Sequence, residues 1–275
     1  MKVNRIQKYA VIRFVVITLA LLFFAFPIYW MVTMAFKPEA DWASFPPKLI
    51  PDRPTIDNFY KGLFRMGGFQ GLIDSLIISG TNMLISLIIG SMAGFGLSRY
   101  KGGQNIAFFI LSQRFAPAIT FALAFFAMFS AFKLLDTHIA VIITHLTFNI
   151  PFATWVMKSF FDGVPKDLEE SALVDGCTLR SAFFRVVLPA SLPGLIATSA
   201  MLFMFSWNEF LIQLFLTKSA VKPLPTLIPR FYGGHDILYG VVCAIAFLAS
   251  LPPILIVTFF QKYLVRGLTL GYIKG

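Results

Sequence analysis

The sequence predicts an all-α membrane protein with six transmembrane helices. Of its 275 residues, 57% are hydrophobic, only 13% are charged, and 32 are phenylalanine. A soluble domain typically carries about 25% charged residues. Six apolar stretches each exceed the roughly 20 residues that a helix needs to cross the hydrocarbon core of a bilayer. We expect the spans at about 14–36, 72–98, 105–132, 138–160, 192–217 and 238–263.

The first predicted span begins after Arg13, at the end of a segment that contains basic residues and no acid. Tyr29 and Trp30 lie toward its other end, where aromatic side chains anchor a helix at the membrane surface. A proline-rich loop at 37–70 follows. We expect this loop outside the cytoplasm, with a short helix at 57–65.

The second and third spans differ in their polar content. The second contains Gly90 and Gly94, and small residues at this spacing let two helices approach closely. It ends at a basic turn, 99–101. The third contains Arg114 and Pro117 in apolar surroundings.

The last three spans also contain polar residues. The fourth holds Asn149 near its middle, and the fifth holds Trp207, Asn208 and Glu209. The sixth is followed by a basic tail. Cytoplasmic segments carry an excess of lysine and arginine, so six spans with basic terminal segments predict that both termini are cytoplasmic. The net charge of +10 follows from this topology, and we expect no nucleic-acid partner.

A polar loop at 161–191 separates the fourth and fifth spans. Pro165 suits the first position of a helix, and Glu169 places negative charge in its first turn, where the helix dipole favours it. Gly176 is suited to end this helix, because glycine enters the left-handed conformation without strain. Thr178 can cap a second helix. We expect two short helices joined by a turn.

The spacing in this loop resembles the EAA loop of the permease subunits of binding-protein-dependent ABC importers. The family pattern is E-A-A, three residues, G, nine residues, I, any residue and L-P. Here serine replaces one alanine and valine replaces the isoleucine, while the spacing is intact. The pattern falls on Glu170, Ser171, Ala172, Gly176, Val186, Leu188 and Pro189. The alternative is an ordinary amphipathic helix pair on the membrane surface.

Two further runs carry the same resemblance. The run Ser206-Trp-Asn-Glu-Phe210 is similar to one that is common in carbohydrate-uptake permeases, and the ending at 261–275 is similar to their closing sequence. With the six spans, the resemblance covers essentially the whole chain. The chain resembles the smaller type of permease, the one related to the maltose transporter.

This resemblance implies a role and a set of partners. A second permease would form the path of a sugar or sugar-like solute together with this chain, and an extracytoplasmic solute-binding protein would deliver the solute. Two ATPase subunits would supply the energy and hold the ATP and Mg²⁺. The chain would be a single permease domain, 1–275, in contact with lipid in the cytoplasmic (inner) membrane of a bacterium or archaeon. The residues that couple to the ATPases would be Glu169, Glu170, Ser171, Ala172 and Gly176.

No catalytic residue, metal site or bound cofactor is expected on this chain. It lacks the G-x-x-x-x-G-K-[ST] loop that cradles nucleotide phosphates and the H-E-x-x-H pattern of zinc proteases. His145 fits a packed or hydrogen-bonded residue better than a ligand. The two cysteines are expected to be free thiols.

Polar residues inside apolar spans predict the substrate path. Ionisable side chains are costly in a membrane and usually face a polar cavity or a partner. The candidates are Arg114, Asn149, Trp207, Asn208 and Glu209. Their alternatives are structural pairing for Arg114 and Glu209, a bond between helices for Asn149, and packing for Trp207. Since consecutive helical residues point about 100° apart, we expect Asn208 and Glu209 to face the cavity.

Two other functions fit the sequence less well. An integral membrane enzyme that acts on lipid-linked substrates would need a carboxylate or histidine cluster at one membrane face, and the carboxylates cluster only in the EAA-like loop. An ion-coupled secondary carrier typically shows inverted repeats, and the sequence shows none.

Overall fold

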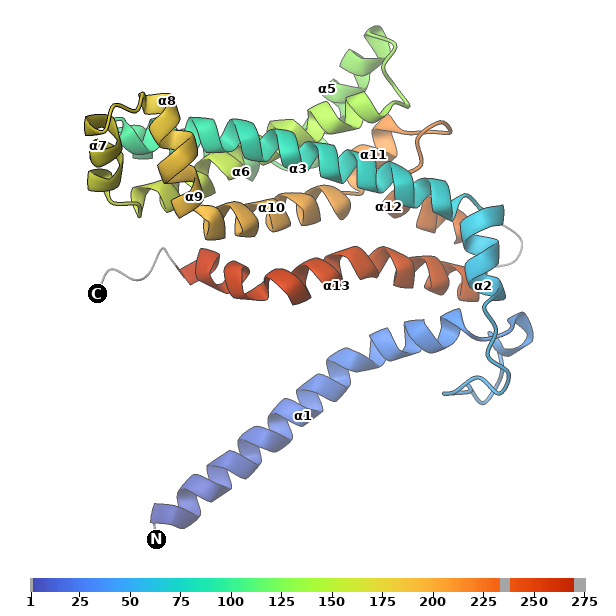
Figure 1. Ribbon diagram of the computed structural model, residues 1–275. Helices are drawn as coiled ribbons and strands as arrows, with labels where there is room; N and C mark the ends of the chain where they lie inside the picture. Colours follow the sequence, from blue (N-terminus) through green and yellow to red (C-terminus); the bar gives the residue numbers. More distant parts are fainter. Residues whose placement is uncertain (1, 233–237, 270–275) are drawn as a thin grey trace. The chain divides into compact units, whose positions relative to one another are not determined.

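The computed structural model describes residues 2–232 and 238–269, so the final part of the closing run, 270–275, lies outside the described residues (Figure 1). All regular structure in the described ranges is helical, as predicted. The chain divides into two compact units. The first comprises Met1–Phe69 and Ile228–Ser250, and the second comprises Gln70–Leu227 and Leu251–Gly275.

The first unit is held together around the C-terminal end of α1. Its helices are α1 (Lys2–Ala35), α2 (Asp57–Tyr60) and the start of α13 (Tyr239–Thr269). The buried amide group of Asn58 donates hydrogen bonds to the carbonyl oxygens of Ala35 and Lys37, at 2.9 and 2.8 Å. Trp42 donates to the same Lys37 oxygen at 3.1 Å. The helix predicted at 57–65 is present, because α2 continues into a π-helical turn, Lys61–Arg65.

The second unit is built on the close approach of α3 and α6. Its helices are α3 (Gly68–Arg99), α4 (Gly103–Ser112), α5 (Ala118–Ala131), α6 (His138–Asp162), α7 (Lys166–Val174), α8 (Leu179–Ala182), α9 (Leu188–Ala190), α10 (Leu192–Trp207), α11 (Leu211–Leu216) and α12 (Leu224–Leu227). A Cβ atom on Gly90 would lie 2.4 Å from the Cβ of Ala153, and one on Gly94 would lie 2.8 Å from the backbone nitrogen of Lys158. The predicted small-residue contact is therefore confirmed.

Four helices of the described chain are long and apolar enough to cross a membrane. They lie at Tyr9–Ala35, Gly68–Arg99, His138–Asp162 and Tyr239–Tyr263. Two helix pairs meet the same test only when taken together, because each is bent at a short break. The number of spans is thus four, or up to six if each bent pair is one span.

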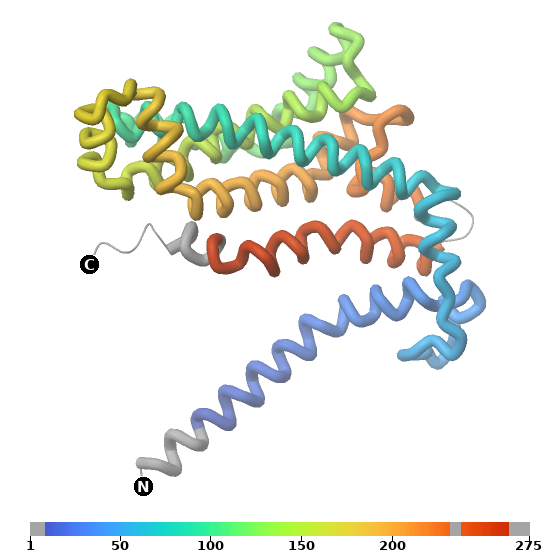
Figure 2. The backbone as a smooth tube through the Cα atoms, in the orientation of Figure 1, coloured from blue at the N-terminus to red at the C-terminus, as the bar shows by residue number. Residues whose placement is uncertain are grey.

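The third predicted span, 105–132, is not one continuous helix. The segment that ends at Phe115 meets α5 at 82°, and the trace turns sharply there (Figure 2). Pro117 has no backbone N–H and disfavours a helical conformation in the residue before it. Accordingly, Ala116 is extended, with φ −69° and ψ 134°.

The fifth predicted span, 192–217, is also interrupted. α10 ends at Trp207 and α11 begins at Leu211. The carboxylate of Glu209 accepts hydrogen bonds from the backbone N–H groups of Ile212 and Gln213, at 2.8 and 3.1 Å. The first backbone N–H groups of a helix have no hydrogen-bond partner within that helix. The carboxylate of Glu209 therefore caps the start of α11. This interruption is not the second bend noted above. That bend lies at the start of α10, where the segment Leu179–Ala190 meets α10 at an angle of 78°.

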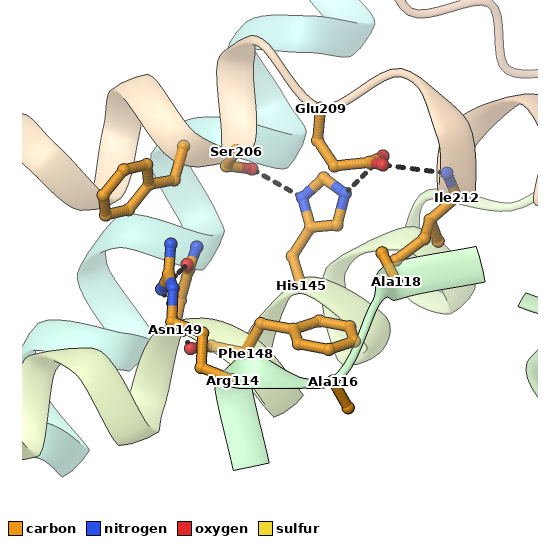
Figure 3. Close-up of a pocket in the computed structure, with 10 residues that line it drawn as sticks. Arg114, Ala116, Ala118, His145, Phe148, Asn149, Ser206, Glu209 and Ile212 are labelled. Carbon is orange, nitrogen blue, oxygen red and sulfur yellow. Dashed lines mark hydrogen bonds and ion pairs between the residues drawn. The ribbon is translucent and has the colours of Figure 1, made fainter. Parts of the chain in front are cut away.

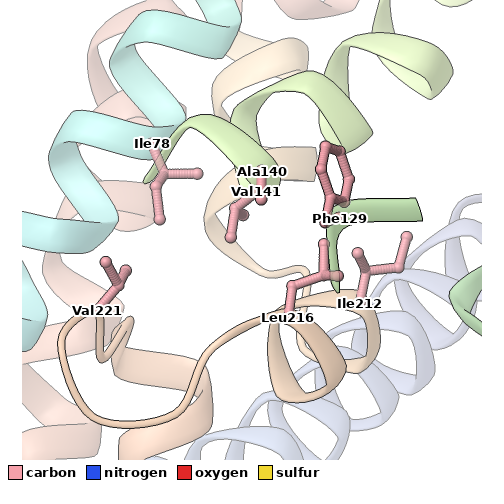
Figure 4. Packing of buried hydrophobic residues seen from close by; sticks show 7 residues of the cluster. All are labelled: Ile78, Phe129, Ala140, Val141, Ile212, Leu216 and Val221. Atoms are coloured by element: carbon pink, nitrogen blue, oxygen red, sulfur yellow. The ribbon is translucent and has the colours of Figure 1, made fainter. Parts of the chain in front are cut away.

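A buried apolar cluster fixes α11 against its neighbours (Figure 4). The cluster consists of Ile78, Phe129, Ala140, Val141, Ile212, Leu216 and Val221. Its side chains come from α3, α5, α6, α11 and the loop after α11. The short helix α11 therefore has a defined position although it is only 6 residues long.

Two carboxylates hold the loop that follows α11. Asp136, with φ +60°, accepts hydrogen bonds from four consecutive backbone N–H groups, those of residues 218–221, at 2.8–3.1 Å. Asp74 is fully buried and accepts from the backbone N–H of Lys222 at 2.8 Å. Burial alone would raise the pKa of the Asp136 carboxyl group, but the four N–H donors hold this pKa well below its usual range.

We expect Asp136→Asn to lower the free energy of unfolding by about 2 kcal/mol, the typical value of hydrogen bonds to a charged group. Because the pKa is lowered in the folded state, this stabilisation is present above the unfolded-state pKa of about 3.9 and is lost as the pH falls further. Thermal unfolding in detergent should therefore show a Tm difference from the wild type that is large at pH 7 and narrows below pH 4. The control is Asp175→Asn, since Asp175 is exposed. An equal effect of the two substitutions would contradict the role of Asp136.

Candidate functional site

A cavity with charged and polar groups in its lining lies where the chain breaks before α5 and before α11 (Figure 3). Its volume is about 220 Å³. It is lined by Arg114, Ala116, Ala118, His145, Phe148, Asn149, Phe205, Ser206, Glu209 and Ile212. The structure thus brings together three of the five residues predicted for the substrate path, which come from separate segments of the sequence.

Glu209 forms the acidic side of the cavity. Its carboxylate caps α11, and one oxygen also lies 3.4 Å from Nε2 of His145. The Glu209 side chain keeps 21% of its surface exposed, whereas that of His145 keeps 2%. The carboxylate is therefore fixed by the protein on one side and open to the cavity on the other.

His145 links this carboxylate to α10. Its Nδ1 lies 2.7 Å from the hydroxyl oxygen of Ser206, so the imidazole is held between a hydroxyl group and a carboxylate. His145 is thus the packed or hydrogen-bonded residue that the sequence predicts, but it is not among the residues predicted for the substrate path. A signal was available, because His145 and Asn149 are four residues apart and residues at this spacing share one face of a helix.

Arg114 forms the basic side of the cavity through aromatic and neutral polar contacts. Its guanidinium carbon lies 4.2 Å from the ring centre of Phe205 and 4.9 Å from that of Phe152. Its Nη1 donates to the carbonyl oxygen of Phe148 at 3.1 Å and to the amide oxygen of Asn149 at 3.3 Å. Contact with aromatic faces stabilises a desolvated cation. Asn149 in turn donates to the amide oxygen of Asn82 at 2.6 Å.

The other two predicted path residues lie elsewhere. Trp207 is buried, with 2% exposure, and stacks on Phe203 at 5.4 Å between ring centres. Asn208 is exposed and donates to the carbonyl oxygen of Met204 on its own helix at 2.9 Å. Neither residue lines the described cavity. Of the expected pair, Asn208 and Glu209, only Glu209 lines the cavity.

The predicted coupling residues lie on α7 and the turn after it. Gly176 has φ +87°. The backbone N–H of Cys177 bonds to Ala172 and that of Gly176 to Leu173, both at 3.0 Å, which is the pattern of a glycine-terminated helix. Thr178 then caps α8 through a hydrogen bond from Ser181 N at 3.3 Å. The helix-turn-helix predicted for this loop is present.

The two glutamates of this loop differ in their surroundings. Glu169 is 8% exposed and accepts a hydrogen bond from Nε of Arg99, at the end of α3, at 2.6 Å. Glu170 is exposed and lines a groove of about 590 Å³ together with Lys166. Ser171 is exposed and Ala172 is buried. Glu169 is therefore engaged inside the subunit, and Glu170 is free to meet another molecule.

The described residues contain no group of three or more His, Cys, Asp or Glu side chains that could hold a metal ion. The cavity offers instead a guanidinium group, a carboxylate, an amide, a hydroxyl group and aromatic faces. Such a set hydrogen-bonds hydroxyl groups and stacks on apolar ring faces.

The comparisons with known proteins agree with these features. Residues 86–270 match the family described as "Binding-protein-dependent transport system inner membrane component". The chain is 33% identical to the trehalose transport system permease protein SugB of Mycobacterium tuberculosis, over 100% of both chains. It is 30% identical to the trehalose/maltose transport system permease protein MalG of Thermococcus litoralis, over 91% of both. These relatives are transport subunits, not enzymes.

The fold also has a solved counterpart. A chain in the crystal structure of a bacterial ABC transporter involved in the import of the acidic polysaccharide alginate superposes with a TM-score of 0.78 at 19% identity, and the match covers 94% of this chain and 96% of that chain. At this identity the likeness concerns the fold alone. The family match spans more than half of the sequence, and the chain therefore belongs to the family of binding-protein-dependent transport system inner membrane components.

Proposed function

We propose that this chain is the permease subunit of a carbohydrate-uptake ABC importer and forms, with a second permease, the path of a sugar or sugar-like solute. The observation that carries the proposal is the full-length similarity to a permease named for trehalose transport. The cavity supports it, since hydroxyl groups of a sugar need hydrogen-bond partners and its C–H faces pack on aromatic rings. The hydrogen-bond partners in the cavity are Arg114, Asn149, Ser206 and Glu209, and the aromatic ring is that of Phe205.

The partners follow from the same proposal. Two ATPase subunits, which bind ATP and Mg²⁺, dock on the loop that contains α7 and Gly176. An extracytoplasmic binding protein delivers the solute, and an alginate transporter of the same fold has been crystallised in complex with such a periplasmic protein. The termini, the turn at 99–101 and the loop at 161–191 lie in the cytoplasm, and the loop at 37–70 lies on the other side.

The alternative of a membrane enzyme is not favoured. The cavity does bring His145 between Ser206 and Glu209, which is the kind of cluster that an enzyme would need. However, the relatives that match at least 90% of the chain are named as transport permeases. Within a transport subunit, the same three groups provide donors and acceptors along a path.

Purification from the native cell tests the assembly. We expect this chain to copurify with a Walker-motif ATPase and a second permease. In proteoliposomes, a sugar-loaded binding protein should increase ATP hydrolysis several-fold and drive uptake of a disaccharide such as trehalose or maltose. Absence of an ATPase from the purified complex would contradict the proposal, as would ATP hydrolysis that no sugar-loaded binding protein stimulates.

Glu209→Gln tests the solute path, because it keeps the size of the side chain and removes its charge. A hydrogen bond to a charged group is worth about 1.5–3 kcal/mol, so the apparent KM of uptake should rise about tenfold or more. Asn208→Ala is the matched control at the neighbouring position outside the cavity lining, and it should leave KM near the wild-type value. A lowered Tm with an unchanged KM would show that Glu209 acts only as the cap of α11.

Gly176 tests the coupling loop. Gly176→Val places a β-branched side chain at φ +87°, which costs about 1–2 kcal/mol and misdirects α8. We expect an assembled complex whose ATP hydrolysis no longer responds to the loaded binding protein. Gly176→Asn is the control, since asparagine tolerates the left-handed conformation, and it should retain most of the response. Equal responses of the two variants would show that the shape of this turn does not matter for coupling.

A further inference from the structure

The loop between α1 and α2 exposes three large apolar side chains within six residues. Phe45 is 96% exposed, Ile50 is 72% exposed and Leu49 is 57% exposed. Single exposed apolar residues are common on proteins, but a group of them in one loop marks a surface that contacts a partner or a membrane.

A hydrogen bond fixes the position of this loop along α1. The hydroxyl group of Tyr29 donates to the carbonyl oxygen of Leu49 at 2.9 Å. Tyr29 precedes the end of α1 at Ala35, and a rise of 1.5 Å per residue places it about 9 Å before that end. The chain therefore turns back beside the helix after leaving it (Figure 1).

The level of Tyr29 is that of the membrane surface. The span Tyr9–Ala35 has 27 residues, so it is about 40 Å long and exceeds the roughly 30 Å of the hydrocarbon core. The surplus of about 10 Å places part of the helix among the lipid headgroups. Tyr29 and the adjacent Trp30 are of the residue types that concentrate at this depth. The tether thus holds Leu49 at the boundary between headgroups and acyl chains.

The polar groups of the loop suit this position. Pro46, Pro47 and Pro51 have no backbone N–H and so leave no donor without a partner in an apolar medium. The amino group of Lys48 contacts the carboxylates of Asp41 and Asp52, at 2.7 and 2.8 Å. The charge of Lys48 is therefore already paired with carboxylates, so it does not enter the membrane surface as an isolated charge.

We propose that the segment at 45–51 inserts into the lipid leaflet at the C-terminal end of α1, with Phe45, Leu49 and Ile50 facing the acyl chains. The loop thereby acts as a second anchor that fixes the depth of this end of α1 in the membrane. Lipid is favoured over a protein partner because the patch adjoins α1, and the most apolar 18-residue window of this helix has no residue buried within the described structure.

Spin labelling of the complete transporter in liposomes tests this proposal. Cys177 and Cys243 are replaced by serine, and single cysteines are introduced as Phe45→Cys and Ile50→Cys. Phe26→Cys, on the exposed side of α1, is the reference in lipid, and Asp57→Cys, at an exposed position of α2, is the reference in water. Collisions of each label with oxygen, which concentrates in lipid, are compared with collisions with a water-soluble nickel chelate.

We expect the ratio of oxygen to nickel collisions at Phe45→Cys and Ile50→Cys to exceed that at Asp57→Cys several-fold and to approach that at Phe26→Cys. A ratio equal to that at Asp57→Cys would overturn the proposal, because the loop would then be in water. Low collision rates with both reagents would also overturn it, because a protein subunit would then cover the patch. Both introduced positions are exposed, so neither substitution removes a packed side chain.

Discussion

The cavity depends on the hydrogen bonds between Glu209 and the first N–H groups of α11. A helix that breaks within an apolar region leaves backbone groups that lipid cannot satisfy. Glu209 accepts from two of these groups, so the interruption after α10 becomes stable. The same carboxylate faces His145 and the cavity. One side chain thus creates both the gap between two helices and the negative charge that lines it, while the cluster around Ile212 and Leu216 fixes α11 in place.

The positive charge of the cavity is stabilised differently. Among the described ion pairs, none joins Arg114 to Glu209. Arg114 lies instead between two phenylalanine rings and donates to neutral oxygens. The two charges therefore remain separate, with His145, Ser206 and Asn149 between or beside them (Figure 3). An arrangement of this kind offers donors and acceptors to a solute without first having to break an ion pair, whose separation would cost free energy.

Sequence patterns were sufficient for the long helices and for the two short helices of the loop at 161–191. α3 and α6 follow long, predominantly apolar runs, and Gly176 and Thr178 mark the turn through their intrinsic conformational preferences. The two breaks were not predicted. Pro117 within an apolar run is also compatible with a kinked but continuous span, and Glu209 is recognisable as a cap only once the start of α11 is known. Likewise, the rule that polar residues avoid lipid does not place Asn208, because this side chain is satisfied by Met204 on its own helix.

The helix α6 connects the cavity to the loop that contains α7 and α8. His145 and Asn149 line the cavity from this helix. Met157 lies about 18 Å further along the helix than His145, and Phe161 follows one turn later. Both pack with Phe183 and Val187 of the segment after α8 and with Phe95 of α3. Arg99 adds polar links from the end of α3, to Glu169 on α7 and to the carbonyl oxygen of Phe161. Since close-packed side chains resist independent displacement, a force on α7 acts on the ends of α3 and α6 together. Glu169 thereby connects the loop to the bundle, whereas Glu170 is exposed on the outside of the loop.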